Sequence, residues 1–172
     1  YLIASIIAHH GEEEARLWLK GVKENLARRP QGNDRSQVKA IYEGQCDISL
    51  GNSYYFGAMM ADPEQQEWAR SVKLLFPNQE NRGTHVNISG MALTKYAPNR
   101  EDAIKLMGFL VSEEAQKIYA EVNYEFPVRQ GVTLSPLLKP YDGFISDKIP
   151  LIDFIQYRRD ASILVDQVGF DE

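Results

Sequence analysis

The amino-acid sequence predicts an α/β protein on three observations. Residues 46–51 and 84–90 alternate apolar and polar side chains at the period of two that a half-buried strand requires, and residues 72–77 also read as a strand. Longer segments repeat apolar residues at three- and four-residue steps, which is the spacing of one face of a helix. Glycine and proline punctuate the ends of these segments, so each is expected to be a separate element.

A pair of adjacent tyrosines follows the first of these strands. The strand ends at Gly51, and Tyr54 and Tyr55 then open a helix expected at 53–61, with Ser53 as its N-cap. In open α/β sheets, ligands bind beyond the carboxyl ends of the strands. The two phenols are therefore expected where binding usually occurs.

The residue types of Tyr54 and Tyr55 allow two interpretations. In the first, one ring packs in the core and the other covers an interface, as large amphipathic aromatic side chains commonly do. In the second, both phenols are ligands of a hard metal ion, because a highly charged cation displaces a phenol proton even though the phenol pKa is near ~10. Hard oxygen donors favour ferric iron over zinc or copper(I).

Composition restricts the class of protein. A chain of 172 residues with 44% hydrophobic and 25% charged residues has the composition of a folded globular protein. Its net charge of -5, with basic residues dispersed among acidic ones, argues against nucleic-acid binding. No apolar run reaches the ~20 residues of a membrane helix. The single cysteine, Cys46, has no disulfide partner and is expected to be an inert buried thiol.

The chain begins with a predicted helix at 2–10 that ends at Gly11. His9 and His10 point in different directions on this helix, so they are expected to interact with its C-terminal dipole rather than to bind a metal ion together. The apolar pattern begins at Tyr1 without an initiator methionine, which predicts a fragment of a longer chain. The lack of a signal peptide therefore says nothing about export.

Five further helices are expected at about 12–29, 33–44, 99–111, 112–122 and 151–168. The apolar faces of the first and last of these are Ala15, Trp18, Val22 and Leu26, and Phe154, Tyr157, Ala161 and Leu164. Asn33 or Asp34 is the expected N-cap of the second helix, and Ser112 marks the start of the fourth. His85 is expected as a polar residue at a strand edge, with metal ligation as the alternative.

No convincing catalytic set is present in the sequence. It has no GxSxG elbow, no phosphate-binding glycine loop, no HExxH and no GxGxxG. The carboxylate pairs Glu12-Glu13 and Glu113-Glu114 lie at predicted helix starts, where negative charge is favourable. The sequence therefore predicts a protein that is not an enzyme.

With these motifs placed, the chain resembles the C-terminal part of the bacterial periplasmic ferric-ion-binding proteins, the substrate-binding components of iron ABC transporters. The matching stretches follow the order of that family and lie at residues 7–11, 26–35, 52–55, 87–93, 110–116, 124–128 and 168–171. Because they span nearly the whole chain, the resemblance is more specific than the tyrosine pair alone.

The resemblance implies a periplasmic-binding-protein type II (Venus-flytrap) fold that binds ferric iron between two lobes. Tyr54 and Tyr55 match the adjacent tyrosines whose phenolates bind the metal in that family. Asn52, Arg35 and the turn at 32–34, which contains Asn33 and Asp34, match regions beside the iron that, in some members, help to hold a synergistic anion such as carbonate. The implied function is capture of ferric iron in the periplasm and its delivery to an inner-membrane ABC permease.

The resemblance also implies a division into lobes. Residues 1–84 are expected in the C-terminal lobe, 85–132 in a crossover segment that belongs partly to the N-terminal lobe, and 133–172 again in the C-terminal lobe. The other metal ligands of the family do not map onto this sequence, and Tyr1 aligns a few residues past the nearest of them. A segment without its partner lobe exposes apolar surface, so an oligomer or a domain swap is expected.

Other functions remain open at this point. The same scaffold suits a small anion such as phosphate, sulfate or an organic acid, held by Asn52, Arg35 and the amides near Ser53. A small hydrolase or transferase, and a purely structural module, are the remaining alternatives.

Overall fold

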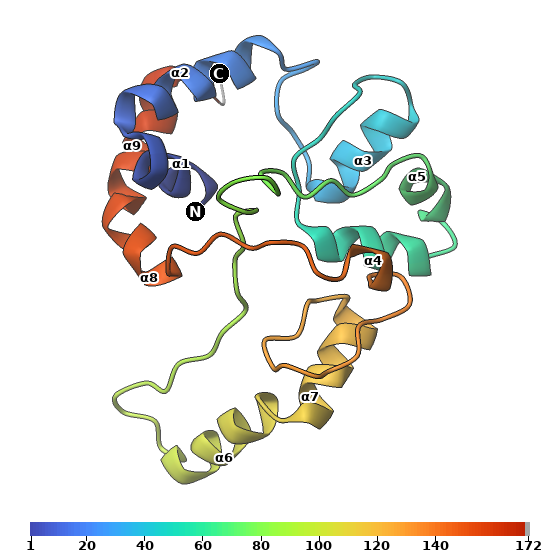
Figure 1. Ribbon diagram of the computed structural model, residues 1–172, viewed down its shortest axis with the longest axis vertical. Coiled ribbons are helices and arrows are strands. Elements are labelled where there is room, and N and C mark those ends of the chain that lie inside the picture. The colour runs from blue at the N-terminus through green and yellow to red at the C-terminus, as the bar shows by residue number, and fades with distance from the viewer. Residues whose placement is uncertain (171–172) are drawn as a thin grey trace. The chain divides into compact units, whose positions relative to one another are not determined.

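The computed structural model describes residues 1–170 and consists of helices joined by long connecting segments (Figure 1). In chain order the helices are α1 (Leu2–His10), α2 (Glu12–Glu24), α3 (Asp34–Tyr42), α4 (Ser53–Ala61), α5 (Gln66–Arg70), α6 (Arg100–Leu110), α7 (Glu113–Ile118), α8 (Leu151–Phe154) and α9 (Arg158–Val168). A π-helical turn follows α7 at Tyr119–Asn123, and 3-10 turns lie at Lys139–Tyr141 and Ile155–Tyr157. Asp171, in the stretch 168–171, lies outside the described residues. None of these helices is both long and apolar enough to cross a membrane.

The chain folds as two compact units. Unit 1 consists of residues 1–31, 76–87 and 144–170, and unit 2 consists of residues 32–75 and 88–143. Each unit is thus assembled from segments that are distant in the sequence. The assignment of residues 1–84, 85–132 and 133–172 to the two lobes of the family stays a prediction.

Unit 1 has an apolar core between α1, α2, α8 and α9, and three of these helices, α1, α2 and α9, lie side by side in Figure 1. Ile6, Leu19, Phe154 and Leu164 are at most 5% exposed. Full burial of one such side chain contributes about 1.5–3 kcal/mol, so these few residues account for much of the stability of the unit. The burial of Phe154 and Leu164 confirms the face predicted for the last helix.

The predicted apolar face of α2 is confirmed at Ala15 and wrong at Trp18. Trp18 is 38% exposed, whereas Leu19, its neighbour, is 2% exposed and packs in the core with Ala15. Ala15 and Leu19 are four residues apart and lie on the same side of the helix. The helix also ends at Glu24, earlier than the predicted end near residue 29.

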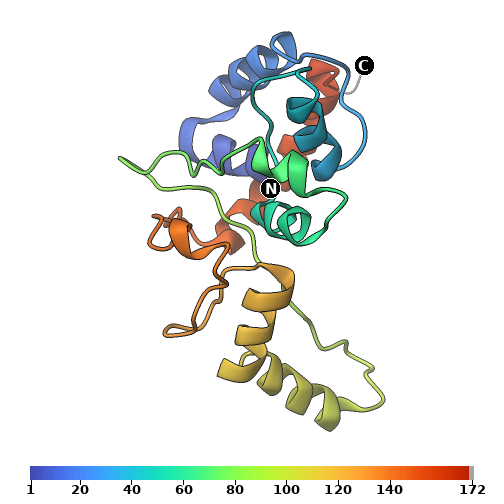
Figure 2. The same ribbon diagram turned by 90° about the vertical axis from the view of Figure 1, so that its right-hand side faces the viewer.

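The three predicted strands are not formed in the described residues. The single β-bridge there joins Thr84 to Ser146, and Figures 1 and 2 draw no arrow. A strand requires a neighbour to accept its backbone hydrogen bonds, and the described part of the chain supplies none beyond this bridge. The apolar side chains of the predicted strands are consequently left exposed to solvent; Ile48 is 82% exposed and Leu75 is 87% exposed.

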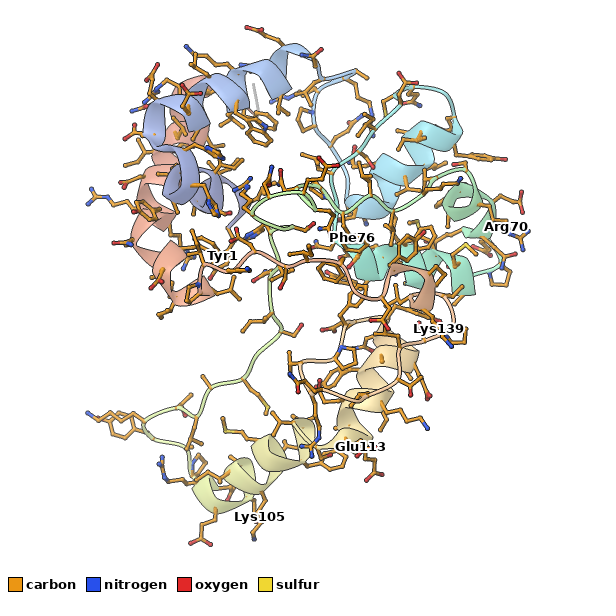
Figure 3. All side chains as sticks on the ribbon, viewed as in Figure 1. Tyr1, Arg70, Phe76, Lys105, Glu113 and Lys139 are labelled. Atoms are coloured by element: carbon orange, nitrogen blue, oxygen red, sulfur yellow. The ribbon has the colours of Figure 1, made fainter. Side chains whose placement is uncertain are left out.

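Unit 2 contains two groups of helices. The helices α3, α4 and α5 pack on one another, with Met59 and Ala69 fully buried between them. The helix α6 packs on α7 but buries none of its own residues. Figure 3 shows the side chain of Lys105 standing out from α6, in agreement with its 75% exposure.

Several predicted helix ends are confirmed and others are wrong. Asn33 is the N-cap of α3 and Ser112 is the N-cap of α7, each accepting a hydrogen bond from a backbone amide three residues later. Ser53 is not the N-cap of α4, because Asn52 has that position and Ser53 is already helical. Cys46 is only partly buried and lies outside any strand, because the expected strand is absent.

Candidate functional site

Tyr54 and Tyr55 lie next to each other in the first turn of α4, within unit 2. Their ring centroids are 4.3 Å apart and their ring planes are inclined by 36°. Tyr54 is 38% exposed and Tyr55 is half-buried. The structure therefore places neither ring in a closed apolar core, so at least one phenol is open to a ligand.

The two phenols interact through their hydroxyl groups. A side-chain hydrogen bond with Tyr55 is the largest of several effects that together raise the pKa of Tyr54 to about 12; the others are partial burial and the negative charges of Tyr55, Asp34 and Glu125. Tyr54 is therefore a neutral phenol at pH 7. An ion that binds its oxygen has to displace the proton, which a highly charged cation does and an anion does not.

The side chain of Arg35 lies over Tyr55. Its guanidinium carbon is 5.6 Å from the centre of the Tyr55 ring, and Nη1 donates a hydrogen bond of 3.3 Å to Oε1 of Gln65. A guanidinium at this distance from an aromatic face is attracted by the electrons of the ring. Arg35 thus brings a fixed positive charge to the side of the pair that belongs to Tyr55.

The two asparagines predicted beside the site have different surroundings. Asn33 caps α3, since its Oδ1 accepts hydrogen bonds from the amide and the hydroxyl of Ser36. Asn52 caps α4 by position, but its side chain makes no capping hydrogen bond. Instead, the amide and the side chain of Asn52 both donate to Oδ1 of Asp34, at 2.7 Å and 3.2 Å.

A segment from the C-terminal side of unit 2 also contacts α4. Tyr124 follows the π-helical turn with a φ of 58°, which is uncommon for a residue that is not glycine. Its ring packs on Gly57, where an added Cβ atom would lie 2.3 Å from the ring. The next residue, Glu125, accepts a hydrogen bond of 2.9 Å from the hydroxyl of Ser89.

The histidines lie in unit 1 and are not part of the tyrosine site. Nε2 of His9 is 2.7 Å from Oδ2 of Asp147, and the ring of His85 lies 5.6 Å from that of Phe154. Burial lowers the pKa of His85, which therefore favours the neutral form. Residues 1–170 contain no cluster of three or more His, Cys, Asp or Glu side chains suited to a metal ion.

All five predicted site residues therefore fall in one region of unit 2, around the first turns of α3 and α4. The sequence indicates no role at the site for Glu125, Gln65 or Tyr124. For Asp34, the sequence indicates a helix cap, and the resemblance places it in a turn beside the iron, but neither predicts a contact with Asn52. Its contact with Asn52 joins residues 18 positions apart, and no local pattern signals such a contact.

Comparison with known proteins adds to this geometry. The family described as bacterial extracellular solute-binding protein matches residues 1–142. Iron uptake protein A1 of Synechocystis sp. is 47% identical over 152 residues, which cover 87% of this chain and 42% of that protein.

Two solved structures are similar over almost the whole chain. Apo ferric ion-binding protein A of Pasteurella haemolytica is 48% identical, with a TM-score of 0.96, over 99% of this chain and 54% of that one. A Trichodesmium protein (IdiA, FutA) in complex with iron and citrate is 47% identical, with a TM-score of 0.93, over 98% of this chain and 54% of that one. The chain thus spans about half the length of the relatives that it matches.

Proposed function

Because the chain belongs to the bacterial extracellular solute-binding proteins, we propose that it binds ferric iron through the phenol oxygens of Tyr54 and Tyr55. The family consists of solute-binding proteins and not of enzymes, as the sequence predicted. The predicted resemblance and the periplasmic-binding-protein type II fold are also confirmed, by the similarity to ferric ion-binding protein A. The names of the similar proteins, which refer to iron uptake and to ferric ion, support the proposed cargo.

The adjacent phenols are the observation that carries this proposal. Their rings are 4.3 Å apart and their hydroxyl groups are joined by a hydrogen bond, so both oxygens are directed to the same place. Ferric iron is a hard ion that prefers oxygen donors, and two phenolates offset two of its three charges. Asp34 and Glu125, which act electrostatically on Tyr54, add negative potential that favours a cation.

Proton displacement gives the proposed binding its pH dependence. The pKa of Tyr54 is raised to about 12, so its proton is lost only when the metal takes its place. Each phenol that becomes a phenolate releases one proton, and binding is therefore expected to tighten as the pH rises. Release follows from the reverse step, protonation of the phenolates, or from reduction of the metal to a softer ion.

A small anion has a defined place in this proposal. Arg35 provides a positive charge beside Tyr55, and the start of α4 carries the partial positive charge of the helix. A synergistic anion such as carbonate would bind between these groups and the iron, near Asn52 and Asn33. Binding of phosphate, sulfate or an organic acid without iron is less favourable, because Asp34 and Glu125 repel an anion near Tyr54.

The cellular role extends the same proposal. Membership of an extracellular solute-binding family supports action in the periplasm and delivery of the iron to an inner-membrane ABC permease. The predicted oligomer or domain swap belongs here as well. Its support is that α6 leaves Ile104, Leu106 and Phe109 between 44% and 55% exposed.

A ferric titration followed by visible absorbance tests the proposal. Phenolate bound to ferric iron absorbs visible light, and an anion site gives no such colour. The titration uses this chain and a version extended to the length of the relatives. Each is measured unaltered and with the double substitution Tyr54→Phe and Tyr55→Phe. Tyr42→Phe serves as the matched control, since Tyr42 is an exposed tyrosine of the same unit.

We expect a band that the double substitution abolishes and Tyr42→Phe leaves intact, in at least one of the two versions. A band that survives the double substitution would overturn the proposed ligands. No band in either version, together with binding of phosphate or sulfate by calorimetry, would replace iron with an anion as the cargo.

A further inference from the structure

Three consecutive residues at the start of α3 have three separate tasks. Asn33 caps α3 itself through Ser36, and Arg35 lies over Tyr55. Asp34 lies between them, is half-buried, and directs its carboxylate away from its own helix to Asn52. The N-cap function at this helix start is already filled by Asn33, so Asp34 is not needed for it.

The contact with Asn52 is made where α4 begins. Oδ1 of Asp34 accepts the backbone amide of Asn52 at 2.7 Å and its side-chain amide at 3.2 Å. Asn52 is the residue before the helix and makes no capping hydrogen bond with its own side chain. Asp34 therefore holds the backbone at the point that decides where α4 starts.

The starting point of a helix sets the direction of every side chain on it. Successive residues of an α-helix are rotated by about 100°, because one turn contains 3.6 residues. Tyr54 and Tyr55 follow Asn52 by two and three residues, within the first turn. If the helix began one residue earlier or later, both phenols would thus turn away from their present directions.

The neighbouring glycine leaves room for this contact. A Cβ atom at Gly51 would lie 3.1 Å from Oδ1 of Asp34, which is closer than most Cβ atoms approach a neighbour. Without that atom, the carboxylate reaches the backbone of Asn52 directly. The contact thus depends on a small residue immediately before the helix as well as on the carboxylate.

We propose that Asp34 is a positioning residue of the tyrosine site, which holds the start of α4 through Asn52 so that the phenols of Tyr54 and Tyr55 face one ligand. This inference rests on the proposed function. It assigns Asp34 an action on the helix backbone and not contact with the metal or with an anion. Loss of residues that orient metal ligands typically weakens metal affinity by about 10–100-fold.

Two substitutions separate the hydrogen bond from the charge. Asp34→Asn removes the charge and keeps an Oδ1 acceptor, whereas Asp34→Ala removes both. Ser112→Ala is the matched control, because it deletes a side-chain acceptor of one backbone amide at the start of another helix of unit 2. Each variant is made in this chain and in the version extended to the length of the relatives.

The first readout needs no iron and is the hydrogen exchange rate of the Asn52 amide, measured by NMR. We expect faster exchange in Asp34→Ala, and rates close to those of the unaltered protein in Asp34→Asn and Ser112→Ala. The second readout is ferric affinity with the position of the visible band. Here we expect affinity about 10–100-fold weaker in Asp34→Ala, and a smaller loss in Asp34→Asn, which keeps the acceptor and removes only the negative charge.

The outcomes distinguish this inference from the proposed function. Colour of equal affinity in the unaltered protein and in Asp34→Ala would overturn the role of Asp34 and leave the function in place. Equal losses in Asp34→Asn and Asp34→Ala would also overturn it, because the charge would then be responsible. No colour in the unaltered protein would overturn the proposed function. An unchanged exchange rate of the Asn52 amide in Asp34→Ala would show, without any use of iron, that Asp34 does not hold the start of α4.

Discussion

The core of unit 1 and the tyrosine site of unit 2 are stabilised in different ways. In unit 1, side chains such as Phe154 and Leu164 are removed from water between neighbouring helices. In unit 2, the directions of Tyr54 and Tyr55 depend on polar contacts such as that between Asp34 and Asn52. Apolar burial contributes the larger free energy and is non-directional, whereas hydrogen bonds contribute less but set geometry.

This difference predicts that substitutions in unit 1 mainly affect stability, and that those around the site mainly affect binding. The protein allows the two regions to be followed separately. Its two tryptophans lie in different units, with Trp18 in unit 1 and Trp68 in unit 2. A variant that keeps only one tryptophan therefore reports the unfolding of one unit through fluorescence.

The largest expected effect is that of Phe154→Ala. Phe154 is 1% exposed, and loss of a buried phenylalanine typically costs about 3–5 kcal/mol through lost burial and the cavity that remains. Urea denaturation followed by Trp18 fluorescence, in a Trp68→Phe background, measures the loss. The control is Ile152→Ala in the same helix, where Ile152 is 69% exposed and a change within about 0.5 kcal/mol is expected. Equal effects of the two substitutions would contradict the assigned core.

An intermediate effect is expected for Gly57→Ala, which tests the packing around the site. The added methyl group would lie 2.3 Å from the ring of Tyr124, so the ring or α4 must move, at a cost of about 1–3 kcal/mol. Trp68 fluorescence in a Trp18→Phe background reports this change. Gly108→Ala in α6 is the control, because no atom lies within 4 Å of its added methyl group. Alanine there is expected to stabilise the helix by roughly 0.5–1 kcal/mol.

A loss of stability for Gly108→Ala equal to that for Gly57→Ala would indicate that helix propensity, and not contact with Tyr124, decides the outcome. Gly57→Ala is also expected to weaken ferric binding, because α4 carries Tyr54 one turn before Gly57. Unchanged affinity would show that the contact with Tyr124 has no influence on the phenols.

The smallest expected effect is the pH dependence of unit 1. Burial lowers the pKa of His85 from its ordinary 6.5, so the folded state takes up this proton less readily than the unfolded state. Stability is therefore fully present above pH 6.5 and falls as the pH drops below it, by at most about 1.4 kcal/mol for each pH unit. Urea denaturation between pH 7.5 and pH 5 measures the slope, which His85→Gln should flatten.

His10→Gln is the control for this experiment, since His10 is an exposed histidine of the same unit and its substitution is expected to leave the slope unchanged.

A second fall in the stability of unit 1 is expected at lower pH, from Asp147. Burial alone would raise the pKa of Asp147, but the amide of Ile149 and the contact with His9 lower it below 3.8 overall. The contribution of Asp147 to the stability of unit 1 is thus present above pH 3.8 and is lost as the pH falls below that value.

The amino-acid sequence by itself determined the helices and many of their ends. Apolar spacing placed α1, α6 and the face of α9 correctly, because these patterns depend on neighbouring residues of one helix. Asn33 and Ser112 were recognisable as caps, since each bonds an amide only three residues away. The tyrosine pair was equally visible, because the two residues are adjacent, and the family resemblance was visible from matching stretches along nearly the whole chain.

The tertiary structure decided what depends on residues far apart in the chain. The alternation of Ile48 and Leu50 predicted a strand, but a strand forms only with a neighbour, and the described residues provide none there. Likewise, the contact of Asp34 with Asn52 crosses 18 positions, and that of Gly57 with Tyr124 crosses a longer interval. Such contacts form where folding brings distant backbone segments together, and the periodicity of residues within one segment does not predict them.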